Sequence, residues 1–303
     1  MDLGKAIDLF LQNCRRKELS PHTLRAYEVD LQKFHDFNTA QNLSLQEISA
    51  EHIRNWVDLL YLAGLSASSR KRYLACLKVF CRWIEDEGII SSSPFNGLKL
   101  HIKVPKRLPR NIQQGELQLL FKALENIDAS HGMARQTLKL ALELLIATGL
   151  RISELCNIEI DDIDFSSGTI RVSGKGARER TVFILDEELR ELLEFYLSRR
   201  KKIIVEVDNL LVTPMGRQAT PDYIRRKLHL FTSEAGISKR LTPHMFRHSA
   251  ATLLLENGVD IRFVQRLLGH ASLSTTEIYT HVTESSLKAA LKEGNVRKRL
   301  KSA

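Results

Sequence analysis

Apolar residues recur every three or four positions through residues 1–95, which is the period of amphipathic helices. The stripes are Ile7, Phe10 and Leu11; Leu24, Tyr27, Leu31 and Phe34; Ile53, Trp56, Val57 and Leu60; and Tyr73, Leu77, Phe80 and Ile84. Ser20-Pro21, Ser49 and Ser66 stand just before the later stripes, where N-cap residues belong. No β alternation competes, so residues 1–95 are expected to form a small helical domain.

From residue 112 onward the pattern is mixed. Helical periodicity predicts helices over 113–124, 135–148 and 186–202, one beginning at Ser153, and one from Thr220-Pro221 to Glu234. Three short runs, 162–165, 169–172 and 181–185, are separated by Ser- and Gly-rich turns and predict an antiparallel meander. A further short strand is expected at 210–213. The fold class expected is mainly α with a small antiparallel sheet (α+β).

The last part of the chain carries clear helix boundaries. Thr242-Pro243 is a helix start, with Thr as N-cap and Pro at the first helical position. Gly258 and Gly269 are expected to end helices. Ser274–Glu277 has the spacing of a capping box, which places Tyr279 in the first two turns of a short helix. Residues 284–300 follow as an amphipathic helix.

The segment between the two parts is basic and extended. Ser91–Pro94 ends the helical region, and residues 97–110 contain five basic residues, two prolines and no acid. Such a segment cannot form a core, so residues 96–111 are expected to link a domain of residues 1–95 to one of residues 112–303. It is either a tether or a strap along a phosphate backbone.

Charge points to a polyanionic partner. The 303 residues have a formal net charge of +9 and a pI of about 9.4, which favours nucleic acid. Hydroxyls and cations at the start of the helix near residue 66 suit phosphate oxygens, as does the linker. The cations expected on DNA are Arg70, Lys71, Arg72, Lys103, Lys106 and Arg107.

Cysteine usage and hydropathy favour the cytoplasm. The four cysteines form no C-x-x-C pair, so neither a disulfide framework nor a zinc knuckle is expected. The N-terminal residues lack a basic-then-apolar signal pattern. The most apolar stretch, 138–150, is interrupted by Lys139 and Glu143 and is too short to span a membrane.

Candidate phosphate chemistry falls at turns and helix ends. Two arginines can each bind phosphate oxygens in a fork, and histidines can donate further hydrogen bonds. A tyrosine can form a covalent phosphoryl intermediate, and a lysine can protonate a leaving oxygen. Cations would stabilise charge on the attacked phosphodiester without a metal. The set is Arg151, Lys175, His244, Arg247, His270 and Tyr279.

Each of these residues also has a purely structural interpretation. Arg151 has the spacing for an ion pair with Glu154, and Lys175 suits an ordinary hairpin turn. Tyr279 suits a half-buried core position, and His270 suits the cap of a helix that ends at Gly269.

Two other site classes are disfavoured. His244 and His248 have the spacing of two zinc ligands, but Met245 stands where a zinc hydrolase has glutamate and no third ligand is evident. Gly174-Lys175-Gly176 lacks the upstream glycine and the Ser/Thr of a P-loop. We therefore expect no metal and no nucleotide cofactor.

Taken together, the motifs are more specific than any of their members. In this order, ATGLRISEL, SGKGARER, TPHMFRHSAATLLLENG and LLGHASLSTTEIYTHV resemble the tyrosine recombinase (phage-integrase-like) family. SPHTLRAYEVDL and RKRYLACLKVFCRWIEDEGII are similar to its core-binding helical domain. The resemblance covers nearly the whole chain and is closest in length and pattern to the compact Xer-like branch.

The resemblance implies a role for each candidate. Tyr279 would be the nucleophile that forms a 3′-phosphotyrosine, and Lys175 the general acid. His244 would act as a base or bind the phosphate. Arg151, Arg247, His270 and also Lys175 would hold the oxyanion, with Glu154 and His248 in support.

The resemblance also implies partners. The enzyme would act on double-stranded DNA with inverted half-sites, as a homotetramer or as a heterotetramer with a related recombinase, through a Holliday junction. The helical domain and the catalytic domain would clamp the duplex. The C-terminal helix would dock on a neighbouring subunit; the alternative is that it packs on its own domain. Bacterial or archaeal nucleoid DNA would be the target, in the cytoplasm, for chromosome-dimer resolution, plasmid or transposon resolution, or element integration.

Two other functions share parts of this pattern. A type IB topoisomerase-like enzyme would use the same chemistry as a monomer on DNA of any sequence. A non-catalytic DNA-binding relative would keep the fold, although the complete catalytic set argues against it.

Overall fold

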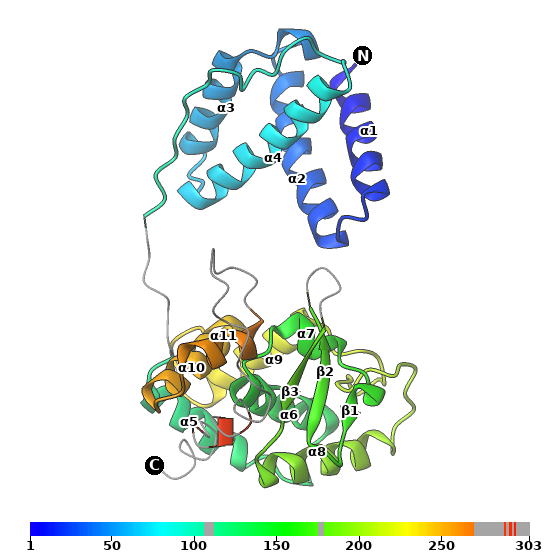
Figure 1. The fold of residues 1–303 in the computed structure, drawn as a ribbon, viewed down its shortest axis with the longest axis vertical. Helices are drawn as coiled ribbons and strands as arrows, with labels where there is room; N and C mark the ends of the chain where they lie inside the picture. Colours follow the sequence, from blue (N-terminus) through cyan, green and yellow to red (C-terminus); the bar gives the residue numbers. More distant parts are fainter. Residues whose placement is uncertain (106–111, 175–178, 270–287, 289–290, 293, 295–303) are drawn as a thin grey trace. The chain divides into compact units, whose positions relative to one another are not determined.

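The protein folds as two compact units, Met1–Arg107 and Leu108–Ala303, which are described separately. The computed structural model describes residues 1–105, 112–174, 179–269, 288, 291–292 and 294. Figure 1 shows helices α1–α4 in the first unit and the mixed elements in the second.

The N-terminal unit is helical, as the periodicity predicts. The side chains of Ser20, Ser49 and Ser66 each accept a hydrogen bond from the backbone N–H three residues on, which confirms the three predicted helix starts. Its elements are α1 (Leu3–Arg16), α2 (Pro21–Thr39), the short η1 (Leu45–Glu47), α3 (Ala50–Leu62) and α4 (Ala67–Asp86).

The core of this unit is aromatic. Phe34 packs edge-on against Trp56, and Phe10 packs edge-on against Phe80. These rings are almost fully buried, so they supply much of the apolar area that drives folding. Leu98 and Ile102 also pack on this core. Part of the basic segment therefore lies on the N-terminal unit, instead of running free as an extended linker.

The second unit is built around one buried helix, α6 (Met133–Thr148), whose side chains are buried on nearly every face. A helix that is apolar all round belongs in the centre of a domain. The helices around it are α5 (Gln114–Glu125), α7 (Ile152–Asn157), α8 (Glu187–Arg200), α9 (Pro221–Glu234), α10 (Pro243–Glu256) and α11 (Ile261–Leu268). α10, α8 and α9 pack directly on α6.

The predicted meander is present as one antiparallel sheet in the order β1-β2-β3. Its strands are β1 (Ile163–Asp164), β2 (Thr169–Ser173) and β3 (Glu179–Phe183), preceded by the short η2 (Ile160–Asp162). Val172 of β2 pairs with Arg180 of β3. With the helices, this confirms the predicted α+β fold class.

Some predictions for this unit are wrong. β3 begins at Glu179, two residues earlier than predicted, because its pairing with β2 extends to Ser173. α7 begins at Ile152, with Arg151 instead of a serine at the N-cap. The segment 210–213 forms no strand of the sheet; it makes an isolated bridge between Val212 and Gln218.

Two helix ends bring distant parts of the chain together. Gly149 ends α6 and Gly269 ends α11, with φ of 64° and 61° respectively. L-residues avoid this left-handed region, so glycine is favoured at both positions. A Cβ at Gly149 would lie 2.7 Å from Leu268 Cδ2. Glycine therefore lets the end of α11 lie directly against the end of α6.

The described residues of the C-terminal segment lie on their own unit. The Lys288 ammonium lies 4.9 Å from the centre of the Phe183 ring, and Leu291 packs on the core. The rest of the predicted helix over 284–300 lies outside the described residues. No helix within the described ranges has the length and apolar composition needed to cross a membrane.

Replacing Gly149 with alanine is expected to lower the free energy of unfolding of the second unit by about 1–3 kcal/mol, because the new Cβ adds left-handed strain and displaces Leu268. Urea denaturation followed by far-UV circular dichroism measures this. Gly115→Ala is the control: nothing lies within 4 Å of a Cβ at this position in α5. An unchanged midpoint for Gly149→Ala would contradict the close approach of the two helix ends.

Candidate active site

The site is organised around one buried carboxylate, Glu154 in the first turn of α7. Its side chain is 5% exposed. Glu154 Oε2 accepts the backbone N–H of Arg151 at 2.8 Å, as an N3 glutamate does in a capping box. Glu154 Oε1 accepts a second hydrogen bond, at 2.6 Å, from the Arg151 guanidinium. The ion pair suggested by the R-x-x-E spacing therefore exists, while Arg151 stays 35% exposed.

A second arginine, Arg180 at the start of β3, holds the other side of the same carboxylate. Its Nη1 and Nη2 donate to Glu154 Oε1 and Oε2 at 3.0 and 2.8 Å. Two parallel bonds of this kind are the strongest arginine–carboxylate geometry. The sequence analysis missed Arg180. The alternation of side chains along the strand could have indicated Arg180, because it places Arg180 on the same face as the buried Val182.

Arg247 of α10 is the third arginine and the most buried. It is 6% exposed. Its Nη1 donates to the carbonyl oxygen of Gly149 at 2.7 Å, and its Nη2 to that of Leu268 at 2.5 Å. Arg247 thus ties the end of α6 to the end of α11.

The three guanidinium groups meet at the C-terminus of α11. Arg180 Nε donates to the carbonyl oxygen of Leu267 at 3.1 Å, and Arg247 to that of Leu268. Arg151 Nη2 donates to that of Gly269 at 3.4 Å. These carbonyls carry the negative end of the helix dipole and have no partner within the helix, so cations are favoured there.

This cluster of three arginines and one glutamate has an excess of positive charge. Among the described residues, Glu154 is the carboxylate that pairs with these arginines. Burial acts to raise the pKa of Glu154, but hydrogen bonds from Arg180 and from the backbone and side chain of Arg151 outweigh it and bring the pKa to about 2. Burial, with repulsion from Arg151, lowers the pKa of Arg247 to about 10. Glu154 and Arg247 are therefore both charged at neutral pH.

An anion fits this arrangement chemically. A buried cation whose pKa is lowered gains from an added negative charge, and the partly exposed Arg151 leaves a route for one to approach. A phosphate group offers several oxygens to guanidinium forks, which are already oriented by Glu154 and the α11 carbonyls. Such preoriented donors suit charge that develops during attack on a phosphodiester.

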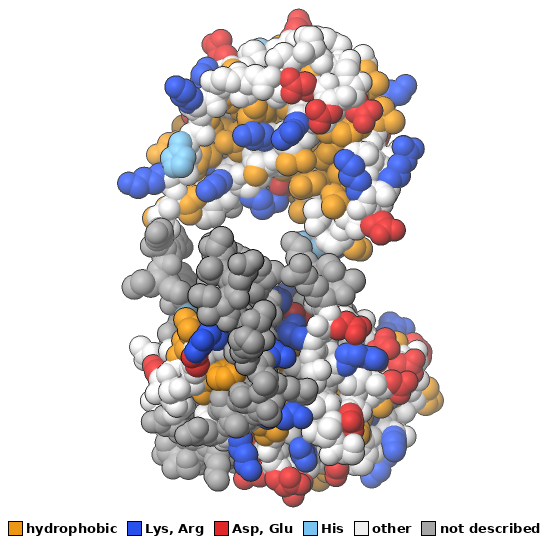
Figure 2. All heavy atoms as spheres, viewed as in Figure 1, with side chains coloured by type: hydrophobic (Ala, Val, Ile, Leu, Met, Phe, Trp, Pro, Cys, Tyr) orange, Lys and Arg blue, Asp and Glu red, His pale blue; other side chains and the backbone are white. Residues whose placement is uncertain are grey.

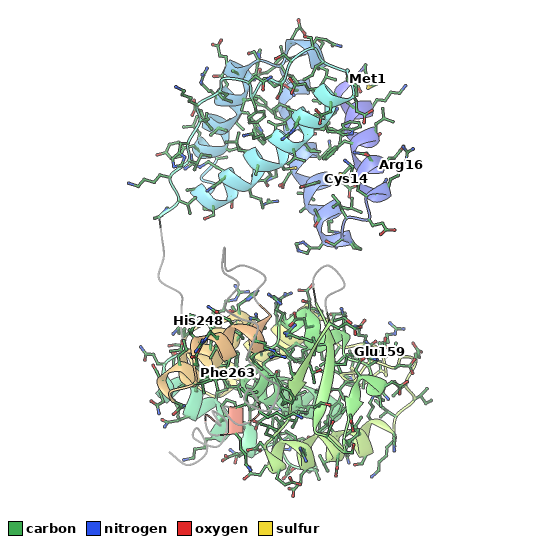
Figure 3. The ribbon with its side chains drawn as sticks, viewed as in Figure 1. Met1, Cys14, Arg16, Glu159, His248 and Phe263 are labelled. Carbon is green, nitrogen blue, oxygen red and sulfur yellow. The ribbon has the colours of Figure 1, made fainter. Side chains whose placement is uncertain are left out.

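The other predicted catalytic residues divide into two groups. His244 is exposed in the first turn of α10, and His248 is half-buried one turn further on, where Figure 3 labels it. Thr242 occupies the predicted N-cap position, although among the described residues its side chain makes no capping bond. Lys175, His270 and Tyr279 lie outside the described residues.

The predicted DNA-contacting cations differ in their surroundings. Arg72 Nη1 donates to both carboxylate oxygens of Asp30, at 2.6 and 2.5 Å. Arg70 lies over the Tyr61 ring, whereas Lys71 is exposed. Lys103 is exposed, and Lys106 and Arg107 lie outside the described residues. Figure 2 shows Lys and Arg side chains interspersed with hydrophobic ones on one face of the N-terminal unit.

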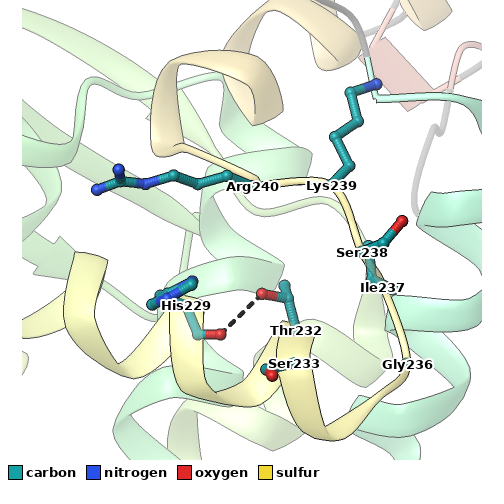
Figure 4. Close-up of a pocket in the computed structure, with 8 residues that line it drawn as sticks. All are labelled: His229, Thr232, Ser233, Gly236, Ile237, Ser238, Lys239 and Arg240. Atoms are coloured by element: carbon teal, nitrogen blue, oxygen red, sulfur yellow. Dashed lines mark hydrogen bonds between the residues drawn. The ribbon is translucent and has the colours of Figure 1, made fainter.

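A separate hollow of about 310 Å³ lies between the end of α9 and the loop that leads to α10 (Figure 4). The residues that line it include His229, Lys239 and Arg240. Figure 4 shows Lys239 pointing away from His229, and its ammonium lies 3.1 Å from Glu116. None of the three clustered arginines lines this hollow, so it is distinct from the candidate active site.

His244 and His248 have the sequence spacing of two zinc ligands. Within the described ranges, no group of three or more His, Cys, Asp or Glu side chains is arranged to hold a metal ion. The four cysteines are all buried and unbridged.

The low pKa of Glu154 predicts a pH dependence of stability. The folded pKa of about 2 lies below the ordinary value of 4.5, so the stabilisation is present above about pH 4.5 and is lost as the pH falls towards 2. Its size is on the order of 3 kcal/mol. Glu154→Gln removes this titration. Calorimetric unfolding at several pH values should show wild type more stable at neutral pH, with a difference that shrinks on acidification. A difference that stays constant down to about pH 3 would contradict the assignment.

The sequence is similar to known proteins along most of its length. Residues 110–286 match the phage integrase family, and residues 7–88 match the phage integrase N-terminal SAM-like domain. The chain is 37% identical to tyrosine recombinase XerC of Oceanobacillus iheyensis, over 96% of each chain. It is 36% identical to tyrosine recombinase XerD of the same organism, over 94% of this chain and 96% of the relative.

A solved structure shows the same fold over most of the chain. The XerH site-specific recombinase, bound to its palindromic difH substrate after cleavage, superposes with a TM-score of 0.73 at 27% identity. The match covers 94% of this chain and 82% of that one. From its fold, its arginine cluster and these matches, the chain belongs to the phage integrase family and is a tyrosine recombinase.

Proposed function

We propose that this protein cuts and rejoins DNA at specific sites through a 3′-phosphotyrosine intermediate and a Holliday junction. The observation that carries the proposal is the convergence of Arg151, Arg180 and Arg247 on Glu154 and on the last carbonyls of α11. The cluster lies directly before the segment that contains His270 and Tyr279.

In this reaction the Tyr279 hydroxyl attacks the scissile phosphate and the 5′-hydroxyl leaves. Lys175 protonates that leaving oxygen, and His244 takes the tyrosine proton or binds the phosphate. Arg151, Arg247 and His270 stabilise the developing charge, with His248 in support. The 5′-hydroxyl of the partner strand then attacks the phosphotyrosine. Because the phosphotyrosine retains the energy of the broken bond, the reaction needs no ATP and no cofactor.

The functional assembly we propose is a tetramer on two duplexes, each with inverted half-sites. Four identical subunits, or two of this chain with two of a related recombinase, both satisfy that geometry. The near-equal identities to a XerC and a XerD of one organism are compatible with either composition. In the XerH structure the recombinase is bound to a palindromic substrate. We propose that this chain acts on DNA in the cytoplasm of a bacterium or archaeon.

For DNA contacts, we propose a domain of residues 1–95, a basic linker of residues 96–111 and a catalytic domain of residues 112–303. Arg70, Lys71, Lys103, Lys106 and Arg107 contact phosphates. Such contacts position the protein without reading sequence. Arg72 is assigned a smaller share, because its guanidinium is already bound to Asp30.

Covalent capture tests the function directly. The full chain is incubated with sheared DNA of the source genome, and fragments that remain bound in detergent are recovered and sequenced. A nicked suicide duplex is then built on the recovered site. The expected result is a detergent-resistant adduct of wild type and no adduct of Tyr279→Phe.

The outcomes separate the alternatives. A non-catalytic DNA-binding protein would give no adduct with wild type. A topoisomerase-like enzyme would give adducts spread over unrelated sequences and would relax supercoiled DNA as a monomer. An adduct formed by Tyr279→Phe would refute the assignment of the nucleophile.

Arg151→Ala is expected to reduce cleavage of the suicide duplex at least about 100-fold, because a guanidinium that stabilises the phosphoryl oxyanion is lost. DNA affinity should change less than about tenfold, since many other phosphate contacts remain. Gel-based cleavage rates and fluorescence anisotropy measure the two quantities. Arg171→Ala, which removes an arginine paired with Asp162 on the sheet, is the control. Loss of binding without loss of single-turnover cleavage would contradict the role of Arg151.

Lys71 and Arg72 are adjacent but are expected to behave differently. Lys71→Ala should weaken DNA binding and lower the slope of log K against log salt by about 1, because one phosphate contact is lost. Arg72→Ala should lower the stability of the N-terminal unit by about 1–3 kcal/mol, since Asp30 is then buried without its partner. Both tryptophans, Trp56 and Trp83, lie in this unit, so tryptophan fluorescence reports its unfolding alone. Equal effects of the two variants on stability would refute the distinction.

A further inference from the structure

Arg180 differs from Arg151 in how completely it is engaged. Each of its three guanidinium nitrogens has a partner: Nη1 and Nη2 donate to Glu154, and Nε donates to the Leu267 carbonyl. Its side chain is 15% exposed. Arg151, by contrast, makes one short bond to Glu154 and is 35% exposed. Arg180 is therefore less accessible to a phosphate than Arg151, and it is well placed to hold its neighbours.

The end of α11 lies directly on the Arg180 side chain. A Cβ built on Gly269 would lie 3.2 Å from the Cδ, Nε and Cζ atoms of Arg180. Since Gly269 has no Cβ, the guanidinium can approach the helix end and reach the Leu267 carbonyl. The contact joins β3 to the residue that immediately precedes His270.

Arg180 also connects β3 to Glu154. β3 follows the turn that contains Lys175, and Glu154 orients Arg151. Arg180 pairs with Val172 across the sheet, at the same end of the hairpin as that turn. One side chain thus links the hairpin, α7 and the end of α11, the three elements from which Lys175, Arg151 and the His270–Tyr279 segment extend.

We propose that Arg180 is a positioning residue for strand cleavage. It fixes the end of α11 and the orientation of Glu154, so that the nucleophile segment starts from a defined point beside the Arg151 and Arg247 guanidiniums. It does this without touching the phosphate. The part of the proposal that concerns cleavage rests on the proposed function; the part that concerns the α11 end does not.

The test compares Arg180→Gln, Arg180→Lys and the matched control Arg171→Gln in the full chain. Arg171 is on the adjacent strand, faces the other side of the sheet and pairs with the partly exposed Asp162. Three quantities are measured: deuterium uptake of peptides that contain Leu267–Gly269, the single-turnover cleavage rate on the suicide duplex, and the Kd for the same duplex.

For Arg180→Gln we expect amide hydrogen exchange at the end of α11 to be about tenfold faster. This is the effect expected when about one net hydrogen bond is lost. Cleavage should slow about 10- to 100-fold, as expected when a reacting group is misplaced, while Kd stays within about threefold of wild type because no phosphate contact is lost. Arg180→Lys keeps the charge but not the fork, so intermediate values are expected. Arg171→Gln should match wild type in all three.

Unchanged exchange at the α11 end in Arg180→Gln would overturn the proposal. So would a loss of DNA affinity as large as the loss of cleavage, which would make Arg180 a DNA contact. If Arg180→Gln does not fold, Arg180→Lys decides: wild-type exchange and wild-type cleavage in that variant would refute the role. If wild type itself formed no adduct, the proposed function would fail, and the exchange data would still test the contact between Arg180 and α11.

Discussion

The interaction on which the catalytic unit depends is the burial of Glu154 among guanidinium groups. A buried carboxylate is costly unless it is paired and hydrogen-bonded, and Arg151 and Arg180 supply that pairing from α7 and β3. In return, Glu154 holds the two cations together at a distance where they would otherwise repel each other. The remaining positive charge is then available for an anionic substrate at a site whose donors are already oriented.

Two helix ends surround this charge cluster and provide carbonyl groups for its arginines. Gly149 and Gly269 end α6 and α11 in left-handed conformations; a Cβ at Gly149 would lie 2.7 Å from Leu268, and one at Gly269 would press on Arg180 at 3.2 Å. Arg247 is buried between the two ends and donates to a carbonyl of each. Helix C-termini present carbonyl groups without intrahelical partners. The same arginines therefore satisfy the backbone and form the anion site, which couples the stability of the unit to the geometry of its chemistry.

The N-terminal unit uses the same pairing for a different purpose. Arg72 binds Asp30, which is 2% exposed, and its guanidinium lies over the Tyr73 ring. Burial raises the pKa of Asp30 even though Arg72 acts to lower it. The charged form of Asp30 therefore depends on Arg72. Adjacent cations at one helix start can thus have different roles: Lys71 faces solvent, while Arg72 belongs to the packing of two helices.

The sequence by itself determined the fold class, the helix starts at serine and threonine caps, and the glycine ends of α6 and α11, because these follow from local periodicity and backbone conformation. It also indicated the R-x-x-E pair, since both residues lie within one helical turn. Only the tertiary structure decided that Arg180 shares Glu154, that Arg247 joins two helix ends, and that Arg72 pairs with Asp30. These partners are separated by 21 to 98 residues in the chain. No local pattern encodes such contacts; they form when the sheet and the helices pack around α6.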